Sequence, residues 1–235
     1  YAPVTINRYI NVMKKLQKAI PDFYGKEDIT FHELNSDFIA TFDLFLKTEA
    51  GLCRNTIVRY MKCFKRITNM ALAKEWMRKD PFYGYKMAQD ETDPVFLTYP
   101  ELKSIMEKEF TIPRLALVRD IFVFAAFTGL AFANVSTLTK DNLVQDNNGD
   151  WWIRKGRVKL ERRHRASSVC NIPLLPVPLA ILKKYEEHPI CRKKSLCLPV
   201  ICNQRMNSYL KEIADLCNIR KNLTTHTAKH SKIYI

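Results

Sequence analysis

The sequence predicts a mainly α-helical protein of two domains, with a small antiparallel β-sheet in the second. Apolar residues recur at steps of three and four through most of the chain, which is the period of amphipathic helices. The stretch 142–175 instead carries β-favouring runs on either side of a turn signal. A segment rich in proline and acidic residues, near 89–94, interrupts the helical period. We therefore expect one domain at 1–93 and another at 94–235.

Two helices are expected first. One spans Val4–Ile20, with Thr5 able to cap its start, and the next begins after Asn35 or Ser36 and ends near Gly51. Glycine suits that end because it adopts positive φ without steric cost. The predicted buried face of the first helix consists of Ile6, Ile10, Met13, Leu16 and Ile20.

A third helix follows, capped by Asn55 or Thr56, and it has two faces of opposite character. The apolar face is expected to meet the core, and the other is strongly positive. The apolar face consists of Ile57, Tyr60, Met61, Phe64, Ile67 and Ala71, and the basic face of Arg59, Lys62, Lys65 and Arg66.

The second domain is expected to begin with a helix capped by Thr98, followed by a long apolar helix that stops at Gly129. A short helix should run through 132–138. In the antiparallel sheet that follows, the turn signal is Asn147-Asn148-Gly149, and a basic tract separates two strand candidates. Helical spacing returns at 179–188 and again at 203–218, where Asn203 is the expected cap.

The excess of basic residues limits the kinds of partner that the protein is expected to bind. Lysine and arginine number 38 against 24 aspartates and glutamates, a net charge of +14, which attracts polyanions and makes nucleic acid the first partner to consider. Ribosomal, membrane-surface and heparin-binding proteins share such charge, so motifs must decide. The most apolar run, 121–133, is shorter than the roughly twenty residues that span a bilayer, and no signal peptide is evident. We expect no membrane association.

The seven cysteines form no C-x-x-C pair and no zinc-ligand spacing with histidine. Cysteines scattered through apolar stretches are typical of reduced, buried thiols in a cytoplasmic protein. We expect neither disulfides nor a metal site.

Four stretches, in order, resemble the tyrosine recombinase or phage integrase family, in its branch of prophage and conjugative-transposon integrases. They are "FAAFTGLAFANVSTLTKDNL", "GRVKL", the pair "IPLLPVPLAIL" and "LPVICNQRMNSYLKEIADLCNI", and "LTTHTAKH". The last resembles the family's H-x-x-R-H box. The resemblance covers nearly the whole chain, and the order of the motifs is more specific than any one of them.

The resemblance implies a two-domain DNA clamp, made of a helical SAM-like core-binding domain and a catalytic domain. It implies site-specific recombination, the integration or excision of a mobile element, through a 3′-phosphotyrosyl intermediate and without a cofactor. The partners would be double-stranded DNA and further copies of the chain, up to a tetramer, in the bacterial cytoplasm at the nucleoid.

The family's site residues carry over to three positions that match, and a fourth position departs from the pattern. Lys159 matches the hairpin lysine, with Lys155 and Arg157 as its nearest rivals, and His226 and His230 match the first and last positions of the box. Lys229 stands where the family has arginine, so it keeps the charge but loses the bidentate fork. It is either a natural variant or a deliberate substitution.

Two further departures concern the first arginine and the nucleophile. Ala131 stands where the family's first arginine is expected. Arg119, about three helical turns earlier, is the candidate to replace it, unless it pairs with Asp120 or another surface acid. Tyr234 follows the box by only four residues, whereas the family's nucleophile lies some tens of residues further on. Either the sequence stops just after the box, or residues are missing between about 228 and 232; we favour the second, with Tyr234 as nucleophile.

The basic residues of the first domain and of the hairpin are the predicted DNA contacts, because they can grip phosphates and reach a groove. The alternative is that this basic face is solvated and does not bind DNA. The predicted set is Arg54, Asn55, Arg59, Lys62, Lys65 and Arg66, with Arg162, Arg163 and Arg165 beside the active site.

The preferred interpretation is a site-specific tyrosine recombinase, and two alternative functions remain open. The departures at Ala131 and Lys229 favour a catalytically inactive DNA-binding protein derived from an integrase. A type IB topoisomerase shares the chemistry but relaxes DNA without site preference. A plain transcription factor would not need "GRVKL" and "HTAKH" in the family's order.

Overall fold

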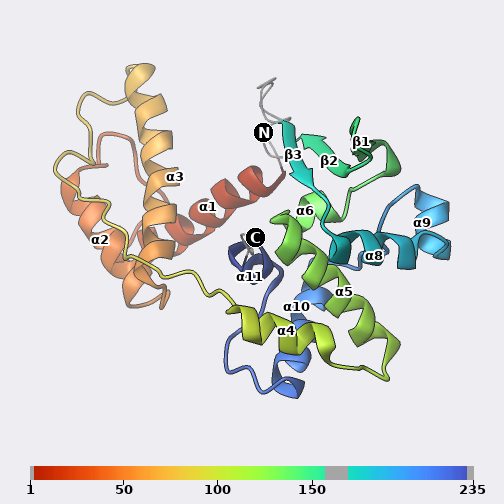
Figure 1. Cartoon of the computed structure of the whole chain (residues 1–235). Helices are drawn as coiled ribbons and strands as arrows, with labels where there is room; N and C mark the ends of the chain where they lie inside the picture. The colour runs from red at the N-terminus through yellow and green to blue at the C-terminus, as the bar shows by residue number, and fades with distance from the viewer. Residues whose placement is uncertain (1–2, 157–168, 232–235) are drawn as a thin grey trace. The chain divides into compact units, whose positions relative to one another are not determined.

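The computed structural model describes residues 3–156 and 169–231 (Figure 1). The chain divides into two compact units, Tyr1–Thr92 and Asp93–Ile235, one residue before the expected boundary. Each unit has its own hydrophobic core. The fold class is as predicted: helices dominate, and the second unit contains a small antiparallel sheet.

Unit 1 contains three helices, α1 (Pro3–Tyr24), α2 (Ser36–Lys47) and α3 (Arg54–Ala73). Its core is largely aromatic. The ring of Phe64 lies edge-on to Phe38, Phe42 and Phe82, with centroids 6.1, 5.7 and 5.6 Å away. These separations are in the favourable range for aromatic pairs, so α2, α3 and the segment after α3 share one packed centre.

The predicted buried face of α1 is wrong in its amino-terminal half. Ile6, Ile10 and Met13 are 47, 38 and 50% exposed. The helix buries Val12 and Ala19, which were not predicted, together with Ile20, which was. Leu16 also packs against the core, so the predicted face is confirmed in its carboxyl-terminal part, where α1 packs against α2 and α3.

The predicted N-terminal cap is correct for α2 and wrong for α3. Asn35 caps α2 as predicted, since its Oδ1 accepts from the N–H of Phe38 at 2.9 Å. The cap of α3 is Cys53, not Asn55 or Thr56. Thr56 already bonds to the Cys53 carbonyl through its N–H, and the Asn55 side chain is engaged with Asp90. The apolar face predicted for α3 is largely buried.

Unit 2 is built around α5 (Pro113–Thr128), which packs against α4 (Tyr99–Glu107) and four later helices (Figure 1). Most residues of α5 are buried, as its apolar sequence predicted. It ends at Gly129, which has φ +66°. At the start of α4 the Glu101 carboxylate accepts from the backbone N–H and the hydroxyl of Thr98, which confirms the predicted cap. The short helix α6 (Phe132–Val135) follows.

The predicted sheet has three antiparallel strands in the order β1 (Leu143–Gln145), β2 (Trp151–Gly156) and β3 (Val169–Pro173). A 3-10 turn, η1 (Lys140–Asn142), leads into it. Gly149, with φ +88°, occupies the turn between β1 and β2, where the sequence signalled it. The side chain of Ile153 in β2 faces the core and is fully buried.

After the sheet, the described part of unit 2 contains four helices: α8 (Pro176–Tyr185), α9 (Pro189–Lys194), α10 (Asn203–Leu216) and α11 (Thr225–His230). The sequence had not indicated α9. Asn203 is the first residue of α10 and not its cap, which is Cys202. In the described part of the chain, no helix has both the length and the apolar character needed to cross a membrane.

Candidate active site

His226 and His230 form a pair on α11. Their Nε2 atoms are 3.1 Å apart, and the rings meet edge to face with centroids 4.5 Å apart. The geometry follows from the sequence, because residues four apart lie on the same side of a helix. Both residues are exposed. The pair therefore presents two imidazoles at the surface, joined by a hydrogen bond whose direction depends on their tautomers.

Although the side chain is exposed, partial desolvation of the ring is the main cause that lowers the pKa of His226 below its ordinary 6.5, and electrostatic interactions with His230 and Lys229 lower it further. His226 is therefore neutral near pH 7. Lys229 is exposed on the same helix and adds a full positive charge beside the pair. Two imidazoles and an ammonium on one helical turn can hold a phosphate oxygen by hydrogen bonds and charge.

The helix that carries the pair is fixed at both ends. At its start, the N–H of Thr225 donates to Asn207 Oδ1 at 2.9 Å, and the Thr225 hydroxyl donates to Asn203 Oδ1 at 2.8 Å. At its end, the buried Ser231 accepts from the N–H of Leu97 at 2.7 Å. Asn207 and Ser231 are positioning residues that sequence reasoning missed. Asn203 had been noticed only as a possible helix cap.

Arg119 lies in a polar network inside unit 2. Its Nε donates to Asp120 at 2.9 Å and its Nη1 to the Lys108 carbonyl at 2.7 Å, and its side chain is only 17% exposed. From Arg119 the helix rises about 13 Å to its end at Thr128, before the chain reaches Ala131. The ion pair of Arg119 with Asp120 is the alternative that the sequence left open. The catalytic role of Arg119 stays a prediction.

Asp120, with a side chain 8% exposed, binds two further donors: Lys184 Nζ at 2.7 Å and the Tyr185 hydroxyl at 2.8 Å. Burial raises the pKa of Tyr185, and the Asp120 carboxylate raises it further. Tyr185 is thus a neutral hydrogen-bond donor. The network ties α8 to α5.

Lys155, the alternative candidate for the hairpin lysine, forms hydrogen bonds within unit 2. Its Nζ donates to the Thr137 carbonyl at 2.6 Å and to Asn142 Oδ1 at 3.0 Å, which fixes the turn before β1. The other hairpin candidates and the nucleophile candidate lie outside the described residues. These are Arg157, Lys159, Arg162, Arg163, Arg165 and Tyr234.

On α3, two of the predicted DNA contacts bind the chain's own segment 86–90. Arg54 donates to the carbonyls of Lys86 and Ala88, at 3.2 and 3.3 Å. Asn55 accepts from the N–H of Asp90 at 2.9 Å and donates to its carbonyl at 3.0 Å. These two side chains stabilise the segment that leads out of unit 1.

The remaining basic residues of α3 face outward. Arg59, Lys62 and Arg66 are exposed. Lys62 Nζ donates to the Gln89 side chain at 3.0 Å, and the partly buried Lys65 lies 3.8 Å from Asp80. Three cations thus share an accessible helix face, spaced as the sequence predicted.

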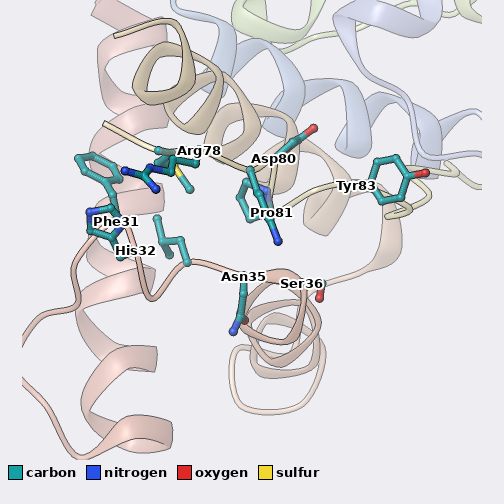
Figure 2. A pocket seen from close by; sticks show the side chains of 11 residues that line it. Phe31, His32, Asn35, Ser36, Arg78, Asp80, Pro81 and Tyr83 are labelled. Carbon is teal, nitrogen blue, oxygen red and sulfur yellow. The ribbon is translucent and has the colours of Figure 1, made fainter. Parts of the chain in front are cut away.

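A cavity of about 630 Å³ lies elsewhere in unit 1 (Figure 2). Phe31, His32 and Arg78 lie at one end of it and Tyr83 at the other. None of the predicted catalytic or DNA-binding residues lines it. Within 3–156 and 169–231, no three His, Cys, Asp or Glu side chains are grouped as a metal site.

Comparisons with known proteins cover both units. Residues 2–87 match the family model of the phage integrase SAM-like domain. No curated protein matches the sequence. Among solved structures, a lambda integrase (75-356) dimer bound to a COC′ core site superposes with a TM-score of 0.73 at 12% identity, covering 99% of this chain and 79% of that one.

Two other solved structures are similar. The XerH site-specific recombinase bound to palindromic difH substrate gives a TM-score of 0.69 at 16% identity, covering 97% of this chain and 67% of that one. The Tn1549 transposon integrase (aa 82-397) in complex with circular intermediate DNA gives 0.64 at 16% identity, covering 94 and 84%. At these identities the likeness establishes the fold.

Proposed function

Because the chain has the fold of the tyrosine recombinases and its residues 2–87 match a phage integrase SAM-like domain, we propose that it is a site-specific DNA recombinase. The observation that carries the proposal is the exposed His226–His230 pair, with Lys229 beside it, on a helix fixed at both ends. These groups lie in the box that resembles the family's phosphate-handling motif. In this reading 1–93 is the core-binding domain and 94–235 the catalytic domain.

The proposed reaction is attack by the Tyr234 hydroxyl on a DNA phosphodiester, in which the hydroxyl gives up its proton to solvent. A phosphotyrosyl bond forms at the 3′ phosphate as the bond to the 5′ oxygen breaks, and Lys159 donates a proton to that leaving oxygen. His226, His230 and Lys229 stabilise the negative charge that spreads over the non-bridging oxygens. The 5′ hydroxyl of a new partner strand reverses the step, and the net result is strand exchange.

The partner in this proposal is double-stranded DNA that carries a recombination site. The solved relatives are bound to such sites, and one is a lambda integrase tetramer on a Holliday junction. By analogy this chain acts as a homo-oligomer of up to four copies, in the bacterial cytoplasm at the nucleoid. Arg59, Lys62 and Arg66 of α3 supply phosphate contacts, and the hairpin arginines supply others.

The second candidate function is DNA binding without cleavage. Ala131 offers no charge where the family's first arginine is expected, and Arg119 is engaged with Asp120. A site without that guanidinium loses much of its ability to stabilise a phosphoryl transition state. Such a protein would hold the recombination site and leave it intact.

The test is a nicked duplex, selected by binding, that traps a covalent protein-DNA adduct on a denaturing gel. An adduct that maps to Tyr234 and is lost in Tyr234→Phe supports the recombinase. Tight binding with no adduct supports the second candidate. An adduct that persists in Tyr234→Phe contradicts the nucleophile assignment. The intact mass of the chain, measured first, establishes whether residues separate the box from Tyr234.

A further inference from the structure

We propose that His226 and His230 form a binding site for a transition-metal dication of the Zn²⁺, Ni²⁺ or Cu²⁺ type. Their Nε2 atoms lie 3.1 Å apart on one face of α11, and both side chains are exposed. The pair is thus reachable from solvent and can bind an ion through two rings at once. Neither histidine lines the cavity of unit 1.

The separation of the two nitrogens suits a chelate. With zinc–imidazole bonds of about 2.0–2.1 Å, two ligand nitrogens are about 2.9 Å apart at a right angle and about 3.3 Å apart at the tetrahedral angle. The observed 3.1 Å lies between these values. Only rotations of the rings are needed to turn both lone pairs toward one ion, and the backbone of α11 can stay in place.

The protons balance without an external base. In the hydrogen-bonded pair one ring carries its proton on Nε2. When a metal ion takes both Nε2 atoms, that ring keeps its proton on Nδ1 instead. A neutral pair therefore changes tautomer and releases no proton.

The ligand type sets the selectivity. Imidazole is a good ligand for Zn²⁺, Ni²⁺ and Cu²⁺, whereas Mg²⁺ and Ca²⁺ prefer oxygen. In the part of the chain that the structure describes, no third ligand side chain joins the pair, so water fills the other coordination positions. Lys229 places a positive charge nearby and weakens binding. Cu²⁺ should bind most tightly of the three.

The anchoring of α11 favours chelation. Its start is held by Asn203 and Asn207, and Thr227, Ala228 and Ser231 on its inner side are buried. The two rings therefore stay at their spacing without a metal, and little conformational entropy is lost on binding. A second ring on the same rigid element raises affinity on the order of 100-fold over a single ring.

One consequence rests on the proposed function. An ion on the two Nε2 atoms removes the donors that would contact the DNA phosphate. Metal and DNA should then compete, and a chelator should restore adduct formation. Metal binding itself does not depend on that function, so the two can fail separately.

The experiment is calorimetric titration of the purified full chain with Ni²⁺ and with Zn²⁺ in the presence of Mg²⁺, together with long-range ¹H–¹⁵N spectra of the imidazoles. The variants are His226→Gln and His230→Gln. His32→Gln and His188→Gln are the controls, because these histidines lie at other places in the fold. Folding of each variant is checked by circular dichroism.

We expect one strong site per chain, shifts of the His226 and His230 ring nitrogens, and an affinity loss on the order of 100-fold in either variant. The control variants should bind as the unaltered chain does. The proposal would be overturned if the chain had no strong site, or if both His226→Gln and His230→Gln bound the metal as tightly as the unaltered chain does. A loss in only one of them would also overturn it, since that indicates a single-ring contact.

Discussion

At the scale of single residues, Lys229 of the box on α11 has the charge of the family's arginine but not its hydrogen-bonding geometry. Lys229 keeps a positive charge beside His226 and His230. An ammonium is a point donor, whereas guanidinium can bond two phosphate oxygens at once. The position is exposed, so a longer planar side chain fits without repacking.

Lys229→Arg should therefore raise the rate of adduct formation on the nicked duplex by at least about tenfold, because it adds a bidentate donor to the transition state. The rate is followed on denaturing gels at saturating protein. Lys193→Arg, on the exposed surface of α9, is the matched control and should change nothing. A Lys229→Arg rate equal to that of the unaltered chain would show that this side chain does not contact the reacting phosphate.

His226 offers a second residue-scale prediction. Its pKa is lowered below 6.5 in the folded chain, first by burial and then by His230 and Lys229. Because protonation is less favourable in the folded state, His226 contributes no penalty above pH 6.5 and destabilises the fold as pH falls below it. Titration by NMR should give a pKa below 6.5.

His230→Gln should raise that pKa toward 6.5 without reaching it, since the larger cause, burial, remains. A control change at His188 should leave it unmoved. A His226 pKa at or above 6.5 in the unaltered chain would refute the assigned electrostatics.

At the scale of elements, α11 depends on α10. The Thr225 N–H lies at the first position of α11, where no helical partner exists for it, and Asn207 provides the acceptor. Asn207→Ala removes that acceptor and should lower the free energy of unfolding by about 1 kcal/mol. Chemical denaturation measures it.

Asn207→Asp is the matched control, because a carboxylate is still an acceptor at the positive end of a helix. It should keep most of the stability. If Asn207→Ala and Asn207→Asp were equally stable, the bond to Thr225 would not hold α11.

Elements also show where local rules suffice. Asn35 at α2 and Gly129 at α5 were predicted correctly, because capping and helix termination depend on residues within four positions. The cap of α3 was not. Asn55 bonds to Asp90, thirty-five residues away, and no local signal indicates that partner.

At the scale of the whole molecule, the net charge of +14 predicts a polyanionic partner, and we propose that the basic face of α3 binds it. The exposed basic face of α3 lies in the unit that matches a phage integrase SAM-like domain. Phosphate contacts release counterions, so affinity for DNA should fall steeply with salt.

Lys62→Ala with Arg66→Ala should weaken binding of a cognate duplex and reduce the slope of log affinity against log salt by about 2, at roughly 0.9 per lost contact. Fluorescence anisotropy at several salt concentrations measures both. Lys193→Ala with Lys194→Ala removes the same charge from the exposed surface of α9 and is the control. Equal slopes for the two double variants would mean that net charge, and not the α3 face, governs binding.

The sequence by itself determined the classes of structure and the residues of the box. Periodicity gave the helices around α5 and the apolar face of α3, since burial follows the 3.6-residue repeat. The spacing of His226 and His230 placed both rings on one helix face. Motif order indicated the fold that the solved relatives share.

Only the tertiary structure decided that Ile6, Ile10 and Met13 of α1 stay exposed, and that Arg119 joins Asp120 in a network with Lys184 and Tyr185. It also decided that Asn203 and Asn207 hold the helix of the box. The physical reason is common to these cases. A polar side chain takes the partner that the packed core brings within hydrogen-bond reach, and for Tyr185 and Asp120 that partner lies sixty-five residues away along the chain.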